Sequence, residues 1–80
     1  MIRVLLADDH AVVRTGFRLL LQSQPDISVV AEAPSGEAAC QMFAELRPDV
    51  VVMDLGMPGM GGLEAMRFFT DSKNVCIDLG

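Results

Sequence analysis

The chain alternates between short apolar runs and segments in which apolar residues recur at helical spacing. The most distinctive run, Val50–Met53, has four consecutive apolar residues between Asp49 and Asp54. A half-exposed strand would alternate polar and apolar residues, so this run predicts a short strand buried on both faces. Asp54 therefore follows the end of a buried strand, and the glycines and proline after it favour a turn that leaves its side chain accessible.

Three other runs are predicted to be strands. Residues 2–7 form an apolar run, interrupted only by Arg3, that is followed at once by Asp8 and Asp9. Residues 27–33 are more polar, which is typical of a strand near a sheet edge. Residues 75–77 form a last short apolar run.

Helical periodicity begins at Ala11. Apolar residues occupy one face of this segment, and Asp9 precedes it as a candidate cap for its first amide groups. Gly16 lies inside the helix and is expected to allow a close approach to the sheet. Arg14 and Arg18 are interpreted as part of a solvated polar face, with partner docking as the alternative. The predicted apolar stripe consists of Val13, Phe17, Leu20 and Leu21.

Two further helices are predicted. Ser35 is a candidate cap for a helix that ends at Arg47-Pro48, and residues 62–69 form the third helix. The resulting order, βαβαβαβ with short connections, predicts a parallel sheet with helices on both faces. In such a sheet Asp8, Asp9 and Asp54 end beside one crevice, provided that the first and third strands are neighbours.

Three carboxylates gathered in one crevice repel one another, and a hard cation relieves that repulsion. Oxygen donors without a pair of histidines favour Mg²⁺ over zinc. An exposed carboxylate beside such an ion is suited to attack a phosphoryl group, so Asp54 is the candidate nucleophile. His10 is interpreted as a solvated turn residue rather than a metal ligand.

Length, charge and composition limit the kinds of protein that this chain can be. Eighty residues predict one domain, and a net charge of -5 argues against direct nucleic-acid binding. No apolar run has the roughly 20 residues of a membrane helix or the pattern of a signal peptide, so we expect a cytoplasmic protein with no membrane contact. Cys40 and Cys76 lack metal-type spacing and are interpreted as buried or half-buried reduced thiols.

Three stretches carry a resemblance to a known family. They are Val4–His10, Val50–Asp54 and the segment 57–64, which contains Met57-Pro58-Gly59-Met60 and Gly62-Leu63-Glu64. Together they resemble the receiver domain of two-component response regulators, in the LuxR-type or NarL/FixJ-like subclass. The resemblance implies a flavodoxin-like α/β fold with strand order 2-1-3-4-5, of which this chain supplies 2-1-3-4.

The resemblance also assigns roles to individual residues. Asp54 matches the phosphoacceptor, Asp8 and Asp9 match the acidic metal-binding pair, and the Gly56 carbonyl matches the backbone ligand of Mg²⁺. The implied partner is a sensor histidine kinase, and the implied activity is self-phosphorylation rather than enzymatic turnover. Residues 1–80 are then one receiver domain that ends after its third helix or fourth strand, without the fifth strand and last helices.

The family pattern fades after Phe69. The hydroxyl residue and the lysine that receivers place after their fourth and fifth strands have no counterpart here. One alternative is therefore a receiver fragment that folds or dimerises and binds Mg²⁺ but does not switch. An exposed sheet edge also favours a homodimer or exchange of the last segment between two copies. A phosphotransferase of the haloacid-dehalogenase type is disfavoured, because Gly56 stands where that chemistry needs a second acid.

Overall fold

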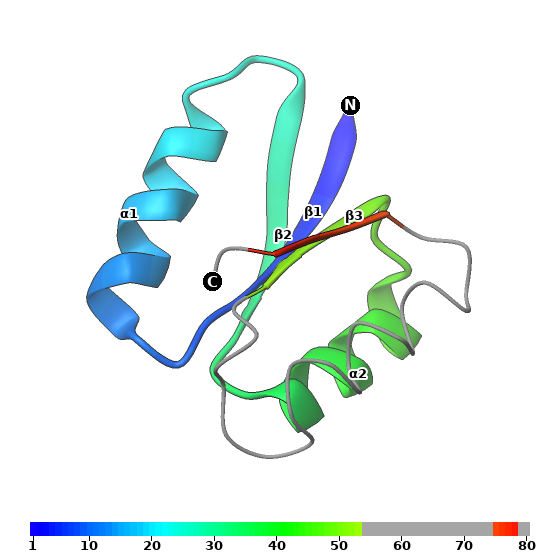
Figure 1. Cartoon of the computed structure of the whole chain (residues 1–80). Helices are drawn as coiled ribbons and strands as arrows, with labels where there is room; N and C mark the ends of the chain where they lie inside the picture. Colours follow the sequence, from blue (N-terminus) through cyan, green and yellow to red (C-terminus); the bar gives the residue numbers. More distant parts are fainter. Residues whose placement is uncertain (54–74, 79–80) are drawn as a thin grey trace.

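The computed structural model describes residues 1–53 and 75–78. The predicted strands and the first two helices are confirmed, and the predicted helix 62–69 lies outside the described residues. The elements are β1 (Ile2–Ala7), α1 (Ala11–Gln22), β2 (Ile27–Ala33), α2 (Gly36–Leu46), β3 (Val50–Met53) and β4 (Val75–Asp78), as Figure 1 shows.

The four strands form one parallel sheet in the order β2-β1-β3-β4, which confirms the predicted topology and the edge position of β2. In the register of this sheet, Ala7 at the end of β1 pairs with both Ala33 of β2 and Met53 of β3. The carboxyl ends of these three strands therefore lie side by side at one edge. Ligands of open parallel sheets bind at this edge.

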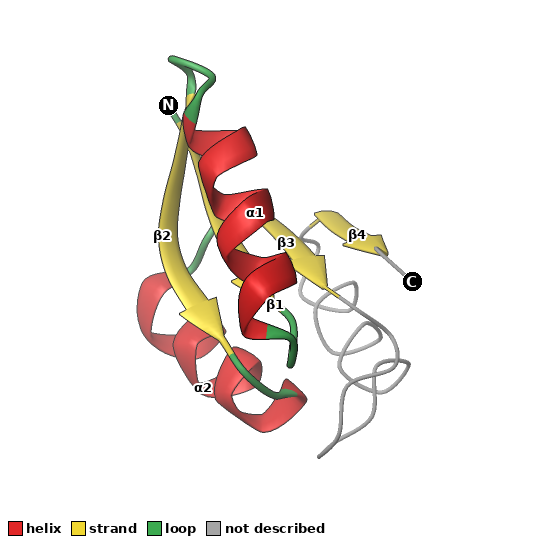
Figure 2. Cartoon of the chain, turned by 90° about the vertical axis from the view of Figure 1, so that its left-hand side faces the viewer, coloured by secondary structure: helices red, strands yellow, loops and turns green. Residues whose placement is uncertain are grey.

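The helices cover opposite faces of the sheet (Figure 2). Alternate residues of β1 point to the two sides: Leu5 and Ala7 pack with Phe43 of α2, while Val4 and Leu6 pack with Phe17 of α1. Because both faces of β1 are covered, its apolar run shows no polar alternation. β3 follows the same rule, since Val51 and Met53 belong to the α2 side and Val52 to the α1 side.

Both ends of α2 have a local cause. The Ser35 hydroxyl accepts a hydrogen bond from the Ala38 N–H at 3.2 Å, which confirms the predicted N-cap. At the other end Arg47 adopts a left-handed conformation with φ 46°, and Pro48 prevents the helix from continuing. Asp49 then joins β3 to the start of β1, because the Arg3 N–H donates to its carboxylate at 2.9 Å.

Two expectations for α1 are wrong. Its N-cap is His10, whose side chain makes no capping hydrogen bond, and the Asp9 carboxylate lies against the His10 imidazole, so Asp9 does not have the predicted role. Gly16 makes no close approach to the sheet, since a Cβ atom built there meets no atom of the described strands within 4 Å.

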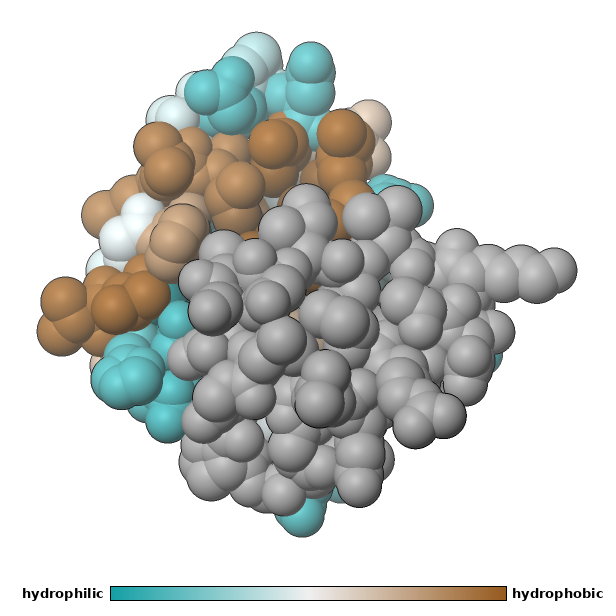
Figure 3. All heavy atoms as spheres, in the orientation of Figure 1, coloured by the Kyte–Doolittle hydropathy of each residue, from teal (hydrophilic) through white to brown (hydrophobic). Residues whose placement is uncertain are grey.

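The apolar stripe of α1 is only partly covered by the described residues. Phe17 and Leu21 pack on the sheet, whereas Leu20 remains 63% exposed and Val13 42% exposed. In Figure 3 the resulting apolar side chains gather on the described surface over α1. The described residues therefore bury α1 less completely than α2, in which Ala39 and Phe43 are fully buried.

Candidate functional site

The first site residue, Asp8, is fixed where β1 ends. Its N–H donates to the Ala33 carbonyl at 3.0 Å, which continues the pairing of β1 with β2 by one residue. Its side chain is only 3% exposed, and one carboxylate oxygen accepts a hydrogen bond from the His10 N–H at 2.7 Å. Asp8 thus lies at the carboxyl edge of the sheet, where the sequence predicted it, and its side chain is buried.

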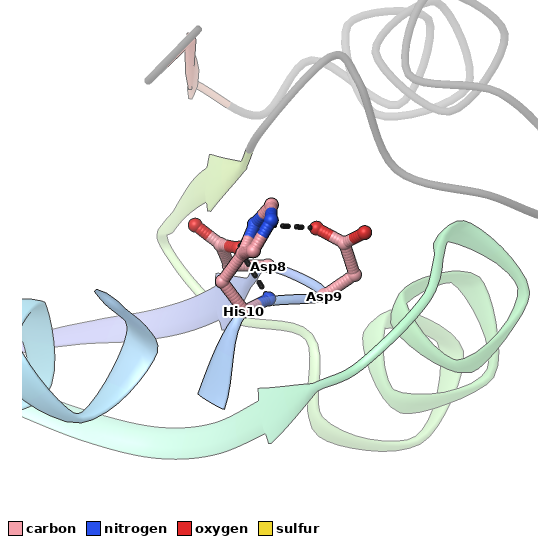
Figure 4. Close-up of side chains that lie close together, drawn as sticks. All are labelled: Asp8, Asp9 and His10. Atoms are coloured by element: carbon pink, nitrogen blue, oxygen red, sulfur yellow. Dashed lines mark hydrogen bonds and ion pairs between the residues drawn. The ribbon is translucent and has the colours of Figure 1, made fainter. Parts of the chain in front are cut away.

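Asp9 and His10 complete an acidic cluster with Asp8 (Figure 4). The Asp9 side chain is 29% exposed, and its carboxylate oxygen lies 2.9 Å from Nδ1 of His10. The same nitrogen lies 3.3 Å from the Asp8 carboxylate. His10 is exposed, as expected for a turn residue, but its imidazole contacts both acids and is therefore more than a solvated side chain.

The donor set of this cluster fits a divalent cation. One donor atom from each of the three residues lies within 4.8 Å of the others, so a single ion can be reached by all of them. Two neighbouring carboxylates, one of them buried, repel each other, and a cation offsets that repulsion. Carboxylate oxygens suit Mg²⁺, while the imidazole nitrogen is a donor that transition metals prefer.

The other predicted site residues, Asp54 and Gly56, lie outside the described residues. Their neighbour Met53 is described, and it pairs in register with Ala7. Asp8 follows Ala7 in the sequence, and Asp54 follows Met53. The acids therefore belong to chain segments that leave the sheet from adjacent, paired positions.

Sequence reasoning missed a charged group beside the cluster. Arg14 donates from Nη1 to the Asp8 backbone carbonyl at 2.6 Å and from Nε to the Glu32 carboxylate at 3.3 Å. Arg18 lies on the other Glu32 oxygen, with 3.1 Å between its Nε and that oxygen, in an ion pair that lacks hydrogen-bond geometry. The interpretation of both arginines as a solvated face is therefore wrong. Their spacing of four residues was the only signal of a shared partner.

An irregularity in β2 explains how Glu32 reaches α1. Val4 pairs with Val29 but Leu5 pairs with Ala31, so Val30 is an extra residue of the β-bulge type. Before it, Val29 packs on the α1 side; after it, Ala31 and Ala33 pack on the α2 side. The bulge thus reverses the alternation, and Glu32 joins the α1 face opposite Leu6.

The family model for the response regulator receiver domain matches residues 4–77. Transcriptional regulatory protein LiaR of Bacillus subtilis is 48% identical over 79 residues, which are 99% of this chain and 35% of LiaR. The nitrate/nitrite response regulator protein NarL of Escherichia coli K12 is 48% identical over 63 residues, which are 79% of this chain and 29% of NarL.

A solved structure shows the same likeness in three dimensions. The two-component response regulator of the LuxR family from Aurantimonas sp. SI85-9A1 superimposes with a TM-score of 0.89 at 41% identity, over 98% of this chain and 57% of that chain. The chain spans about a third of the length of the curated relatives it matches, at 35% and 29%. With the parallel sheet, the acidic end of β1 and these matches in agreement, the chain belongs to the response regulator receiver domains, signalling domains of two-component systems, in the NarL/FixJ-like subclass.

Proposed function

We propose that this chain is a phosphoacceptor that takes a phosphoryl group from a sensor histidine kinase onto Asp54. The observation that supports the proposal best is the pairing of Ala7 with Met53. Because Asp8 and Asp54 are the residues that follow this pair, the cation cluster and the nucleophile start from adjacent strand ends. Carboxylates must lie close together to bind one cation, and residues that follow adjacent ends of parallel strands meet at the same edge of the sheet.

The proposed cation is Mg²⁺, held by Asp8, Asp9, Asp54 and the backbone carbonyl of Gly56. When bound, Mg²⁺ supplies positive charge that offsets the negative charge of the phosphoryl oxygens. Asp8 is buried and fixed by two backbone contacts, whereas Asp9 is partly exposed. Asp8 is therefore suited to anchor the cation and Asp9 to face solvent.

The chemical step belongs to Asp54. A carboxylate oxygen of Asp54 attacks the phosphorus atom in line with the bond to the donor. An oxygen–phosphorus bond forms as the bond between phosphorus and the donor's histidine nitrogen breaks. The electron pair of that bond stays with the nitrogen, and the product on this chain is an acyl phosphate. The step leaves Asp54 phosphorylated and does not regenerate its free carboxylate, so the chain acts as an acceptor and not as a turnover enzyme.

In a whole regulator this domain would control a separate output function. The names of LiaR and NarL describe a transcriptional regulatory protein and a response regulator. We infer that phosphorylation of Asp54 regulates transcription through other parts of such a protein in the cytoplasm. The net charge of -5 argues that these 80 residues do not bind nucleic acid directly. Among the described helices, none combines the length and apolar character that crossing a bilayer requires.

Self-association is the second element of the proposal. In the described sheet β4 pairs only with β3 and is the last strand, and α1 presents apolar Val12, Leu19 and Leu20 to solvent. Edge strands and apolar faces of this kind favour pairing between copies or exchange of a terminal segment. Light scattering at micromolar concentration should give the mass of a dimer. A monomer mass at that concentration contradicts this part of the proposal.

One labelling experiment tests the main proposal. The protein is incubated with Mg²⁺ and a small-molecule phosphodonor, and its intact mass is measured before and after hydroxylamine treatment. We expect a hydroxylamine-labile gain of one phosphoryl group that Asp54→Asn abolishes. Asp49→Asn is the matched control at the other end of β3, since an asparagine oxygen can still accept the Arg3 N–H.

The alternatives give different results in the same experiment. Continuous release of phosphate from the donor would indicate a phosphotransferase of the haloacid-dehalogenase type. Absence of any label, in a sample that still binds the cation, would indicate a receiver fragment that does not switch. Label that persists in Asp54→Asn would place the phosphoacceptor elsewhere in the chain.

A further inference from the structure

We propose that Arg14 is a positioning residue for the cation site and acts through the backbone carbonyl of Asp8. The inference rests on the proposed function, because it assumes that Asp8 and Asp9 hold a divalent cation. Its basis is the 2.6 Å hydrogen bond from Nη1 of Arg14 to that carbonyl. The Arg14 side chain is 20% exposed, so this contact lies largely out of solvent.

The contact completes a two-sided attachment of Asp8. On one side, the Asp8 N–H is bound to Ala33 of β2 at 3.0 Å. On the other, the Asp8 carbonyl is bound to Arg14, which lies on the first turn of α1. The peptide group that joins Asp8 to Asp9 is thereby fixed, and this group sets the direction in which the Asp9 side chain leaves the backbone. Loss of the Arg14 contact would free both carboxylates of the pair.

Arg14 is itself oriented by Glu32. The Glu32 carboxylate contacts Nε of Arg14 at 3.3 Å through one oxygen and Nε of Arg18 at 3.1 Å through the other. It reaches this position because the extra residue Val30 places Glu32 on the α1 face of the sheet. β-Bulges of this kind commonly redirect a side chain next to a functional site. The chain of contacts therefore runs from Arg18 through Glu32 and Arg14 to Asp8.

Electrostatics alone predicts the opposite effect of Arg14. A guanidinium beside the acidic cluster repels an incoming cation, so its removal should tighten cation binding if charge were its main contribution. A positioning role predicts weaker binding when Arg14 is removed, because the two carboxylates would lose their alignment. The sign of the change in affinity thus separates the two roles.

The test measures Mn²⁺ binding to the 80-residue chain by electron paramagnetic resonance of the free ion. Arg14→Met keeps an unbranched stem but removes the charge and the donors. We expect its dissociation constant to rise about tenfold, the lower end of what loss of an outer hydrogen-bond partner costs a metal site. Arg14→Lys, which keeps the charge and one donor group, should recover part of the affinity. Arg3→Met is the matched control. It causes the same change in net charge, but the Arg3 guanidinium binds the Arg47 carbonyl and not Asp8.

A second measurement separates positioning from folding. Amide hydrogen exchange at His10, whose N–H binds the Asp8 carboxylate at 2.7 Å, should be faster in Arg14→Met than in the wild type. Exchange in the β1–β3 ladder should be unchanged. The proposal is overturned if Arg14→Met binds Mn²⁺ as tightly as the wild type or more tightly, or if exchange at His10 is unaltered. Absence of Mn²⁺ binding by the wild type contradicts the proposed cation site instead, and the exchange measurement then still decides the role of Arg14.

Discussion

The Asp8 carboxylate accepts a hydrogen bond from the His10 N–H at 2.7 Å, although Asp8 belongs to the proposed cation site. This bond closes the turn between β1 and α1, and His10 is the N-cap residue of that helix. One side chain therefore serves both the local structure and the charge of the cluster. The two contributions can be separated by substitution.

Asp8→Asn should weaken cation binding without a large loss of stability. The asparagine oxygen can still accept the His10 N–H, while the repulsion from Asp9 disappears. We expect Mn²⁺ affinity to fall by a factor of ten or more, in the roughly 10- to 100-fold range known for impaired metal sites. The free energy of unfolding should stay within about 1 kcal/mol of the wild type. Urea unfolding followed by circular dichroism is suitable, because the chain has no Trp or Tyr.

Asp8→Ala is the comparison variant. It removes the acceptor as well as the charge and leaves the His10 N–H without its partner. Its unfolding free energy should be lower than that of Asp8→Asn by about 1–3 kcal/mol. Equal stability of the two variants would show that the 2.7 Å bond contributes little to the fold.

The cap of α2 is expected to be worth about 1 kcal/mol. Ser35→Ala removes the oxygen that accepts the Ala38 N–H and should lower the unfolding free energy by this amount. Ser35→Asp retains an acceptor and adds a negative charge at the helix N-terminus, so it should be close to the wild type. Chemical denaturation of the three proteins measures the difference. A loss in Ser35→Asp equal to that in Ser35→Ala would contradict the capping role.

The contrast between α2 and α1 shows how far the sequence could predict this fold. Strand positions followed from apolar runs, a parallel sheet followed from the βαβ connections, and the strand order was implied by the family resemblance. The cap of α2 followed from one serine at the right place. The cap of α1 could not be predicted, because two acids precede that helix and either could have turned toward it. Asp8 bonds to the His10 N–H instead, and Asp9 lies against the imidazole.

The acidic residues of the site could be predicted from the sequence, but the arginine side chains that support them could not. Asp8 and Asp9 are recognisable because they follow an apolar strand, and the structure brings them together with His10. The link from Arg14 to Glu32 depends on the extra residue Val30, which reverses the alternation of β2. A pattern of period two assigns Glu32 to the other face, so no inspection of periodicity would have paired it with α1.

Gly16→Ala should stabilise the protein. Gly16 lies inside α1, and a Cβ atom there meets none of the described residues within 4 Å, so they leave room for the methyl group. Alanine is favoured over glycine in a helix interior by about 0.8–1 kcal/mol, and the unfolding free energy should rise by a similar amount. Thermal and urea unfolding provide the measurement. A decrease would indicate that this face of α1 is covered when the protein is in solution, for example by a second copy.

Cys40 should react slowly with alkylating reagents. Burial raises the pKa of the Cys40 thiol, because the thiolate is disfavoured beside the apolar α2 face. In a Cys76→Ser background, the rate of alkylation by iodoacetamide should reach its midpoint at a higher pH in the folded chain than in urea. Coincident midpoints in the two conditions would contradict the raised pKa.

The raised pKa of Cys40 also determines whether the stability of the fold rises or falls with pH. Below the thiol pKa of the unfolded chain, about 8.5, both states hold the proton and the thiol does not affect stability. Above that pH the unfolded chain loses its proton first, so stability falls as pH rises toward the pKa of the folded state. Cys40→Ala should remove this decline between pH 8 and 10, roughly the range in which an exposed thiol titrates. A decline that persists in Cys40→Ala would have to come from other groups.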